Sequence, residues 1–239
     1  MEILAWNLNH RTLEKIIPPE AIHFFKAKDA DIISLNEFVD GSSRDTFKQQ
    51  LSDLGYFHQL ISPKRGKQNR VFVASKKAIR LGDLNPPQQD DASVTNFLHV
   101  VEEESGIEFV GFRAPAYKMY SERQTYWREL ATIMSNAGRR RIVFAGDINY
   151  DPFQGLAASV TDIKFELSQS YYIPNPQGEW SYISLDEKAR TRIDHAIVAS
   201  GLKTTEVRYL VNFQGIQLAG GYDSKAISDH AVLSFSVAE

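Results

Sequence analysis

Residues 139–149 read Arg-Arg-Arg-Ile-Val-Phe-Ala-Gly-Asp-Ile-Asn, a short apolar run that ends in a polar cluster. An uninterrupted apolar run of this length is typical of a strand that is buried on both faces of its sheet. Asp147 and Asn149 would then project from the end of a rigid element, where binding and catalytic sites are commonly built. Gly-Asp-x-Asn is also frequent in plain turns, so this cluster alone does not decide between a turn and a site.

The chain around this segment alternates helices with strands at first and is dominated by strands later. We expect helices from residue 19 and over 43–54 and 121–137. We expect strands over 2–7, 31–35, 56–61, 70–75, 95–103, 107–114, 139–148, 193–199, 207–213 and 231–237. This order favours sheets packed face to face with helices outside over a simple doubly wound sheet. With no repeat and no linker visible, it also predicts a single domain over residues 1–239.

Composition excludes several classes of protein. Of the 239 residues, 43 % are hydrophobic and 24 % are charged, which is ordinary globular usage. The net charge of −3 excludes a wholly basic nucleic-acid-binding surface but leaves room for a local basic patch. The absence of cysteine excludes disulfides, thiolate metal sites and cysteine nucleophiles. No apolar stretch approaches the ~20 residues of a membrane span, and no targeting segment is visible, so we expect a location in the cytoplasm and no membrane partner. We also expect a monomer.

Four further polar clusters lie where expected strands begin or end. They are Trp-Asn-Leu-Asn at 6–9, Ser-Leu-Asn-Glu at 34–37, Arg-Ile-Asp-His at 192–195 and Ser-Asp-His at 228–230. If the clusters converge, Glu37, Asp147, Asp194 and Asp229 place four carboxylates in one cleft. Their mutual repulsion is costly unless a proton or a cation offsets it. Hard divalent cations such as magnesium prefer oxygen ligands, whereas zinc is less favoured by a set without cysteine.

A histidine completes this chemistry. His230 stands beside Asp229, with Asp194 available to orient it, and this is the base-and-orienter arrangement of hydrolytic sites. Asn7 and Asn149 add neutral donors that can hold a phosphate oxygen without adding charge. The set therefore predicts hydrolysis of a phosphate ester.

The ordered set Trp-Asn, Leu-x-Glu, Gly-Asp-x-Asn, Arg-Ile-Asp and Ser-Asp-His resembles the endonuclease/exonuclease/phosphatase superfamily, which includes DNase I and exonuclease III. The resemblance extends over residues 7–230. Each motif is weak alone, but five in the right order near strand ends are specific. The resemblance implies a four-layer α/β sandwich, in which two mixed β-sheets pack face to face with helices on the outside.

The resemblance also implies a metal site. Glu37 would be the principal magnesium ligand, with Asn7 close to the same ion and manganese as a possible substitute. Asp229 would assist at the metal or at the histidine. The aromatic stretch at 180–182 is similar to the loop that precedes the family's Arg-Ile-Asp motif. Trp180 is the residue in it that we select as a candidate for stacking on a substrate base, although packing is the commoner role of an aromatic residue.

The remaining roles follow from the same resemblance. Asp147 would position or activate water, and Asn149 would contact the phosphate. Asp194 would orient His230, which would act as general base or as a phosphate-contacting acid. The group that activates water stays open between Asp147 and His230.

One position departs from the family pattern. Many relatives carry a histidine or tyrosine in the strand at 108–114, and Arg113 stands in that place here. Arginine does not readily give up a proton, but it binds phosphate in a fork and stabilises developing negative charge. We therefore expect Arg113 either to contact phosphate or to pair structurally with a neighbouring acidic residue. Leaving-group protonation would come from elsewhere, with Tyr117 and Tyr120 as conceivable donors.

The sequence thus predicts a magnesium-dependent phosphoesterase, first of all a nuclease that cleaves DNA or RNA by in-line attack of water. A phosphatase or phosphodiesterase for a small phosphorylated molecule, such as an inositol phosphate, is the alternative. A second alternative is a nucleic-acid- or protein-binding module in which Arg113 has weakened catalysis. The basic loop at 64–70 is a candidate contact for a phosphate backbone, although its charges slightly favour a plain solvated loop.

Overall fold

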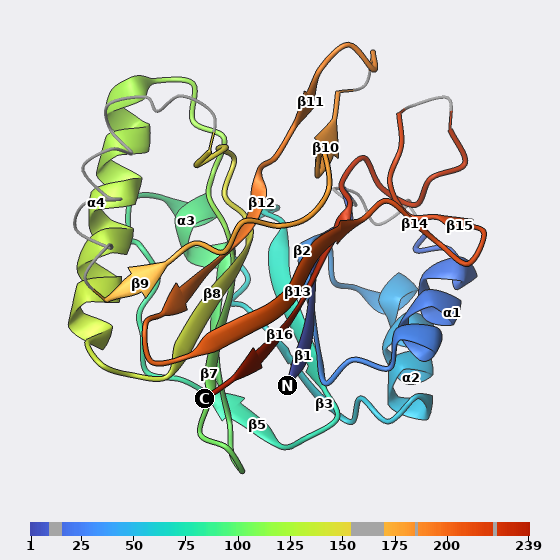
Figure 1. Ribbon diagram of the computed structural model, residues 1–239, viewed down its shortest axis with the longest axis horizontal. Coiled ribbons are helices and arrows are strands. Elements are labelled where there is room, and N and C mark those ends of the chain that lie inside the picture. Colours follow the sequence, from blue (N-terminus) through green and yellow to red (C-terminus); the bar gives the residue numbers. More distant parts are fainter. Residues whose placement is uncertain (10–15, 154–169, 185, 222–223) are drawn as a thin grey trace.

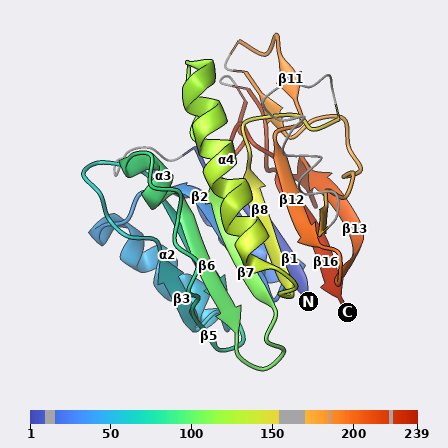
Figure 2. The same cartoon turned by 90° about the vertical axis from the view of Figure 1, so that its left-hand side faces the viewer.

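The computed structural model describes residues 1–9, 16–153, 170–184, 186–221 and 224–239. Its strands form two mixed six-stranded sheets that pack face to face, with helices on the two outer faces (Figures 1 and 2). The predicted four-layer α/β sandwich is therefore confirmed. Within the described ranges, no helix is both long and apolar enough to cross a membrane.

The first sheet has the strand order β13-β16-β1-β2-β4-β3. In chain order its strands are β1 (Glu2–Asn7), β2 (Ile32–Phe38), β3 (His58–Ile61), β4 (Arg70–Ser75), β13 (Lys203–Leu210) and β16 (Val232–Ala238). The second sheet has the order β5-β6-β7-β8-β12-β9. Its strands are β5 (Ile79–Leu81), β6 (Phe97–Glu102), β7 (Glu108–Arg113), β8 (Ile142–Asp147), β9 (Tyr171–Tyr172) and β12 (Asp194–Ala199).

The other elements are helices and short ribbons. The helices are α1 (Pro19–Lys28), α2 (Asp45–Asp53) with the preceding 3-10 turn η1 (Ser42–Arg44), α3 (Asp91–Thr95) and α4 (Tyr120–Ala137). The ribbons pair β10 (Tyr182–Ile183) with β11 (Arg190–Thr191), and β14 (Asn212–Phe213) with β15 (Ile216–Gln217). Helix α4 covers the second sheet, whereas α1 and α2 cover the first (Figures 1 and 2).

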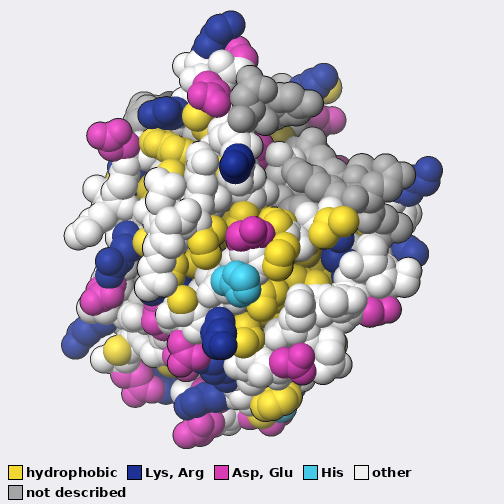
Figure 3. Space-filling view, turned by 90° about the vertical axis from the view of Figure 1, so that its right-hand side faces the viewer, with side chains coloured by type: hydrophobic (Ala, Val, Ile, Leu, Met, Phe, Trp, Pro, Cys, Tyr) yellow, Lys and Arg dark blue, Asp and Glu magenta, His cyan; other side chains and the backbone are white. Residues whose placement is uncertain are grey.

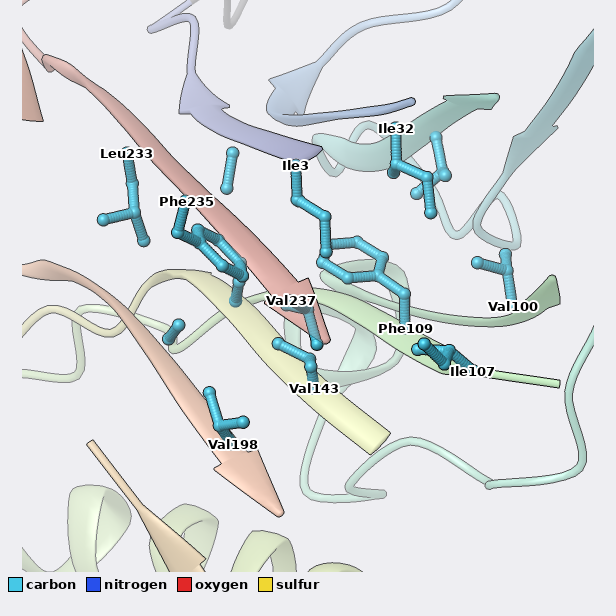
Figure 4. Close-up of a cluster of buried hydrophobic side chains, with 14 of the residues drawn as sticks. Ile3, Ile32, Val100, Ile107, Phe109, Val143, Val198, Leu233, Phe235 and Val237 are labelled. Carbon is cyan, nitrogen blue, oxygen red and sulfur yellow. The ribbon is translucent and has the colours of Figure 1, made fainter. Parts of the chain in front are cut away.

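Three hydrophobic clusters separate the four layers, and they explain why the central strands are apolar throughout. In β8, Val143 faces the cluster between the sheets, whereas Phe144 faces the cluster under α4. In β1, Ile3 points between the sheets and Leu4 points toward α1 and α2. Figure 4 shows the inner cluster, in which side chains from both sheets meet around Phe109. Alternate residues of one strand are thus buried on opposite faces.

The expected helices and strands are found with shifted ends. The strand expected from residue 95 begins at Phe97, because the preceding residues form α3, whose first turn is capped where Asp90 accepts a 2.7 Å hydrogen bond from the backbone of Ser93. The strand expected from 207 begins at Lys203 and ends at Leu210. Strands β5, β9, β10, β11 and β15 were not expected, because two or three residues carry too little periodicity to indicate a strand.

Strand direction brings the polar clusters to one edge of the sandwich. Strands β1 and β2 are parallel, as are β7 and β8, so the carboxyl ends of each pair lie together. Strands β16 and β12 run antiparallel to β1 and β8, so their amino ends reach the same edge. All five sequence clusters therefore meet where the two sheets are packed against each other.

His195, the second residue of β12, provides a test of the fold by pH. Its side chain is fully buried, and Nε2 lies 2.7 Å from the carbonyl oxygen of Arg192, so the neutral ring donates there. Burial lowers the pKa of His195 to about 4 from its usual 6.5. Between pH 6.5 and pH 4 the unfolded chain takes up a proton at His195 and the folded chain does not. The free energy of unfolding therefore falls as the pH falls through this range.

We expect protonation at His195 to lower the free energy of unfolding by about 3 kcal/mol over this pH range. His195→Gln keeps a donor for the Arg192 carbonyl but does not titrate, so the fall in unfolding free energy below pH 6.5 should become shallower. Urea unfolding between pH 7.5 and 4.5 measures the slope. The control His23→Gln, on the exposed face of α1, should keep the original slope. Equal slopes in all three proteins would contradict the prediction.

Candidate active site

Three polar side chains from both sheets meet at the shared edge. Asn7 ends β1, Glu37 lies near the end of β2 and Asp147 ends β8, and each is 2 % exposed or less. The Asn7 amide nitrogen lies 3.0 Å from Asp147 Oδ2 and 3.4 Å from Glu37 Oε1. The predicted convergence of the first three clusters is thus present, with Asn7 bridging the two carboxylates.

Local backbone geometry aims Glu37 into this site. The pairing of β2 with β4 shifts register between Leu35 and Phe38, and Glu37 has a φ of 54°. This irregularity turns the side chain away from the alternation of a regular strand. Asn69, which the sequence analysis did not name as a site residue, lies with its amide nitrogen 3.5 Å from Glu37 Oε2.

Asp147 is placed by β8 and by the turn that follows it. Its Oδ1 accepts a 2.8 Å hydrogen bond from the backbone N–H of Asn149, and its backbone pairs with Asp194 across the sheet. Burial raises the pKa of Asp147 to about 6, while the nearby charges of His230 and Arg113 act in the opposite direction. A buried carboxyl with a pKa near neutrality is suited to accept a proton.

Gly146 allows this close arrangement. It has a φ of 148°, and Asn36 reaches past it to donate a 2.8 Å hydrogen bond to the Phe112 carbonyl in the other sheet. A Cβ at position 146 would overlap that carbonyl oxygen and lie 2.5 Å from the Asn36 amide nitrogen. The glycine thus lets the two sheets approach beside Asp147.

We therefore expect Gly146→Ala to lower the free energy of unfolding by about 2 to 4 kcal/mol, because it combines backbone strain with overpacking. Chemical denaturation measures the change. Gly201→Ala is the matched control, since no heavy atom of the residues that the structure describes lies within 4 Å of a Cβ there. A Gly146→Ala protein as stable as the control would show that the close approach is not required.

The histidine lies beside this carboxylate group. His230 Nδ1 lies 2.9 Å from Asp194 Oδ2, and both side chains are almost fully buried. Asp229 Oδ1 lies 3.9 Å from His230 Nε2, which places Asp229 on the histidine side of the site. Burial by itself lowers the pKa of His230, but the carboxylates of Asp194, Asp147 and Asp229 outweigh it and raise this pKa to about 9. His230 therefore carries a proton at neutral pH.

The other predicted substrate residues lie in different surroundings. Asn149 donates from its side-chain nitrogen to the Ala114 carbonyl over 2.6 Å, and it borders a cavity of about 140 Å³ under the loop between β7 and α4. Trp180 is half-buried against the cluster between the sheets, with the Arg190 guanidinium 5.4 Å from its ring centre. The base-stacking role of Trp180 stays a prediction.

Arg113 reaches the centre of the site. Its Nε lies 3.0 Å from Glu37 Oε1 and 3.3 Å from Asp147 Oδ2. Carboxylate oxygen atoms from both sheets therefore lie around the positively charged guanidinium of Arg113. An all-oxygen set that already holds a positive charge fits a hard divalent cation, so the residues that would bind magnesium are compatible with it.

The candidate proton donors differ in availability. The Tyr117 hydroxyl donates over 2.8 Å to Asp90 and also contacts Ser93, and burial raises the pKa of Tyr117. Tyr120 is exposed at the start of α4. Tyr126, which the helical pattern assigned simply to the apolar face, lines the cavity beside Asn149 with a buried hydroxyl that has no hydrogen-bond partner among the described residues.

A second group of possible metal ligands lies at the other end of β7. Asp83, His99 and Glu108 are close enough together to share an ion. Arg140 Nη2, however, lies 2.6 Å from a carboxylate oxygen of both Asp83 and Glu108. His99 Nδ1 accepts from the backbone of Leu84, and its Nε2 lies 2.8 Å from Glu108. These groups satisfy one another and form a structural ion network.

Comparison with known proteins gives a family and a fold. The model of the Endonuclease/Exonuclease/phosphatase family matches residues 4–230. No curated protein sequence matches the chain. An AP endonuclease from Archaeoglobus fulgidus is similar in structure, with a TM-score of 0.71, 16 % identity and coverage of 99 % of this chain and 98 % of that one.

Two further solved structures share the fold. The 3′ phosphatase NExo from Neisseria, bound to a product DNA hairpin, has a TM-score of 0.71 and 17 % identity over 100 % of both chains. Truncated TDP2 from Caenorhabditis elegans has a TM-score of 0.66 and 12 % identity, covering 100 % of this chain and 97 % of that one. At these identities the likeness shows the fold alone.

Proposed function

This chain belongs to the endonuclease/exonuclease/phosphatase family of phosphoesterases, and from that premise we propose that it is a divalent-metal-dependent nuclease. The observation that supports the proposal is that Glu37 and Asp147 lie around one positive charge, that of Arg113. The buried pair of Asp194 and His230 lies next to them. Magnesium is the proposed ion, with manganese as a substitute.

Glu37 and Asn7 would hold the cation, with Asp147 beside them. When bound, the cation supplies a Lewis acid that polarises a phosphoryl oxygen and offsets the charge developing on the phosphate. Asp147, with its raised pKa, accepts a proton from the water that attacks phosphorus in line. The attack forms the new P–O bond and breaks the bond from phosphorus to the alcohol oxygen of the leaving group, which takes up a proton from solvent, and no covalent enzyme intermediate is formed.

The raised pKa of His230 supports a role as a hydrogen-bond donor. Since His230 carries its proton at neutral pH, it donates a hydrogen bond to a phosphate oxygen rather than acting as the base. Asp194 accepts the Nδ1–H of the imidazolium and fixes the ring, so that Nε2–H can point at the substrate. Asp229 stabilises the imidazolium, and Asn149 contributes a neutral contact to the phosphate.

Charges beside the site favour a polymeric substrate. The loop at 64–70 reaches the site through Asn69, which lies 3.5 Å from Glu37. Arg70 is held by Asp40 at 2.7 Å, whereas Lys64, Arg65 and Lys67 are exposed. By contrast, the face in Figure 3 carries interspersed charges of both signs, without a continuous basic patch. This loop is the proposed contact for a phosphate backbone.

Hydrolysis across a substrate panel tests this function. The panel holds single- and double-stranded DNA, RNA, an abasic duplex, inositol phosphates and a generic phosphodiester. Cleavage of a nucleic acid, with an affinity that falls steeply with salt, is the expected result. Replacing Lys64, Arg65 and Lys67 together by Gln should make the salt slope shallower by up to about 3. Cleavage of only a small phosphate compound would support the phosphatase alternative, and binding without turnover would support the binding module.

Three predictions from the sequence stay predictions. They are the single domain over residues 1–239, the monomeric state and the cytoplasmic location.

A further inference from the structure

Arg113 occupies the position that the proposed function assigns to a metal ion. The residue ends β7, and its backbone is in register with Asp147 on the neighbouring strand. Glu37 approaches from the opposite sheet, so the guanidinium lies between two carboxylates that are each 2 % exposed. Without a positive charge between them, this buried pair would carry a large repulsive energy.

The geometry of the contact shows how Arg113 is held. An arginine that is built to bind a carboxylate permanently uses two parallel N–H groups in a fork. Here the buried Nε lies 3.0 Å and 3.3 Å from the two carboxylates, yet it directs no hydrogen bond at either of them. The contact is therefore mainly one of charge, and the guanidinium is a replaceable counter-ion rather than a locked partner.

A guanidinium and a divalent cation cannot both lie at this point, because like charges a few ångströms apart repel strongly in a buried site. We propose that Arg113 is an internal competitor for the metal: it neutralises Glu37 and Asp147 in the metal-free protein and is displaced when the cation binds. The side chain is 13 % exposed, so it has an open direction in which to move. The displaced guanidinium is then free to bind the phosphate of the substrate.

Two consequences follow from this exchange, which rests on the proposed function. The intrinsic affinity for the cation is reduced by the work of displacing Arg113. In addition, cation and phosphate promote each other's binding. The cation binds the carboxylates of the existing ion pair, and the phosphate binds its guanidinium. Metal binding thus prepares the site for a phosphate substrate.

Titration of the metal-free protein with Mn²⁺ alone, followed by calorimetry, tests the exchange. Arg113→Gln should bind Mn²⁺ at least about tenfold more tightly than the unchanged protein. It should also have a lower melting temperature without metal, and a larger rise in melting temperature on adding Mn²⁺. Arg113→Lys keeps the charge and should remain close to the unchanged protein.

Two controls make the result specific. Arg128→Gln removes an exposed arginine from α4 and should leave Mn²⁺ affinity unchanged. Glu37→Gln should weaken Mn²⁺ binding in every background. If Arg113→Gln binds Mn²⁺ no more tightly than the unchanged protein while Glu37→Gln loses it, the exchange is wrong and the metal site stands. If none of the variants binds Mn²⁺, both the exchange and the proposed metal-dependent function are wrong.

Discussion

Asp147→Asn is expected to lower the rate of phosphodiester hydrolysis by at least about a thousandfold while the protein stays folded. The substitution preserves shape, so the amide can occupy the same volume between Asn7 and Asn149. It removes the group that accepts the proton of the attacking water and one of the two carboxylates around the cation position. Single-turnover hydrolysis of a labelled substrate measures the loss.

The control for charge is Asp53→Asn on the exposed end of α2, which changes the net charge equally. Its rate should match that of the unchanged protein. Thermal unfolding of Asp147→Asn checks that the fold persists. A folded Asp147→Asn protein that retains more than about a tenth of the original rate would rule out Asp147 as the proton acceptor.

Asp194→Asn is expected to reduce hydrolysis by about a hundredfold to ten-thousandfold. The carboxylate accepts from His230 Nδ1 over 2.9 Å, which fixes the ring and keeps the proton on it. An amide in its place carries no charge and can present N–H to Nδ1, so it no longer stabilises the proton on that nitrogen. Loss of the negative charge also lowers the pKa of His230 from about 9, because burial then acts with less opposition.

The pH profile distinguishes this positioning role from simple damage. In the unchanged protein, the fraction of protonated His230 falls as pH rises through about 9. In Asp194→Asn that fall in activity should begin at lower pH. Adding Asp194→Asn to His230→Ala should cost little further activity, since both changes act on one unit. Independent, multiplying effects of the two substitutions would contradict the pairing.

The chain order of strands and polar clusters carries most of the information about this fold. The run at 142–147 is apolar because α4 and the opposite sheet bury its two faces, and this was readable from the sequence. The backbone conformation of Glu37 could not be predicted from the sequence, since its positive φ arises from the pairing between β2 and β4. Short ribbons such as β10 and β11 are held by tertiary contacts and carry no pattern of their own.

The site was predictable as a set of residues but not as a geometry. The order of the motifs predicted that Glu37, Asp147 and His230 lie together, because each was expected at a strand end. The position of Arg113 between two carboxylates depends on how closely the sheets pack, which no sequence spacing records. Helical periodicity likewise explains the aromatic ring of Tyr126 but does not indicate that its hydroxyl has no hydrogen-bond partner among the described residues.

The most direct test of the central claim is hydrolysis of a labelled nucleic acid by the metal-free protein, with and without added Mg²⁺. Glu37→Gln is measured beside it. We expect no cleavage without metal, cleavage on addition of Mg²⁺, and loss of that cleavage in Glu37→Gln, whose missing charge removes the main ligand. Undiminished cleavage in the presence of a chelator, or full Mg²⁺-dependent activity in a folded Glu37→Gln protein, would contradict it.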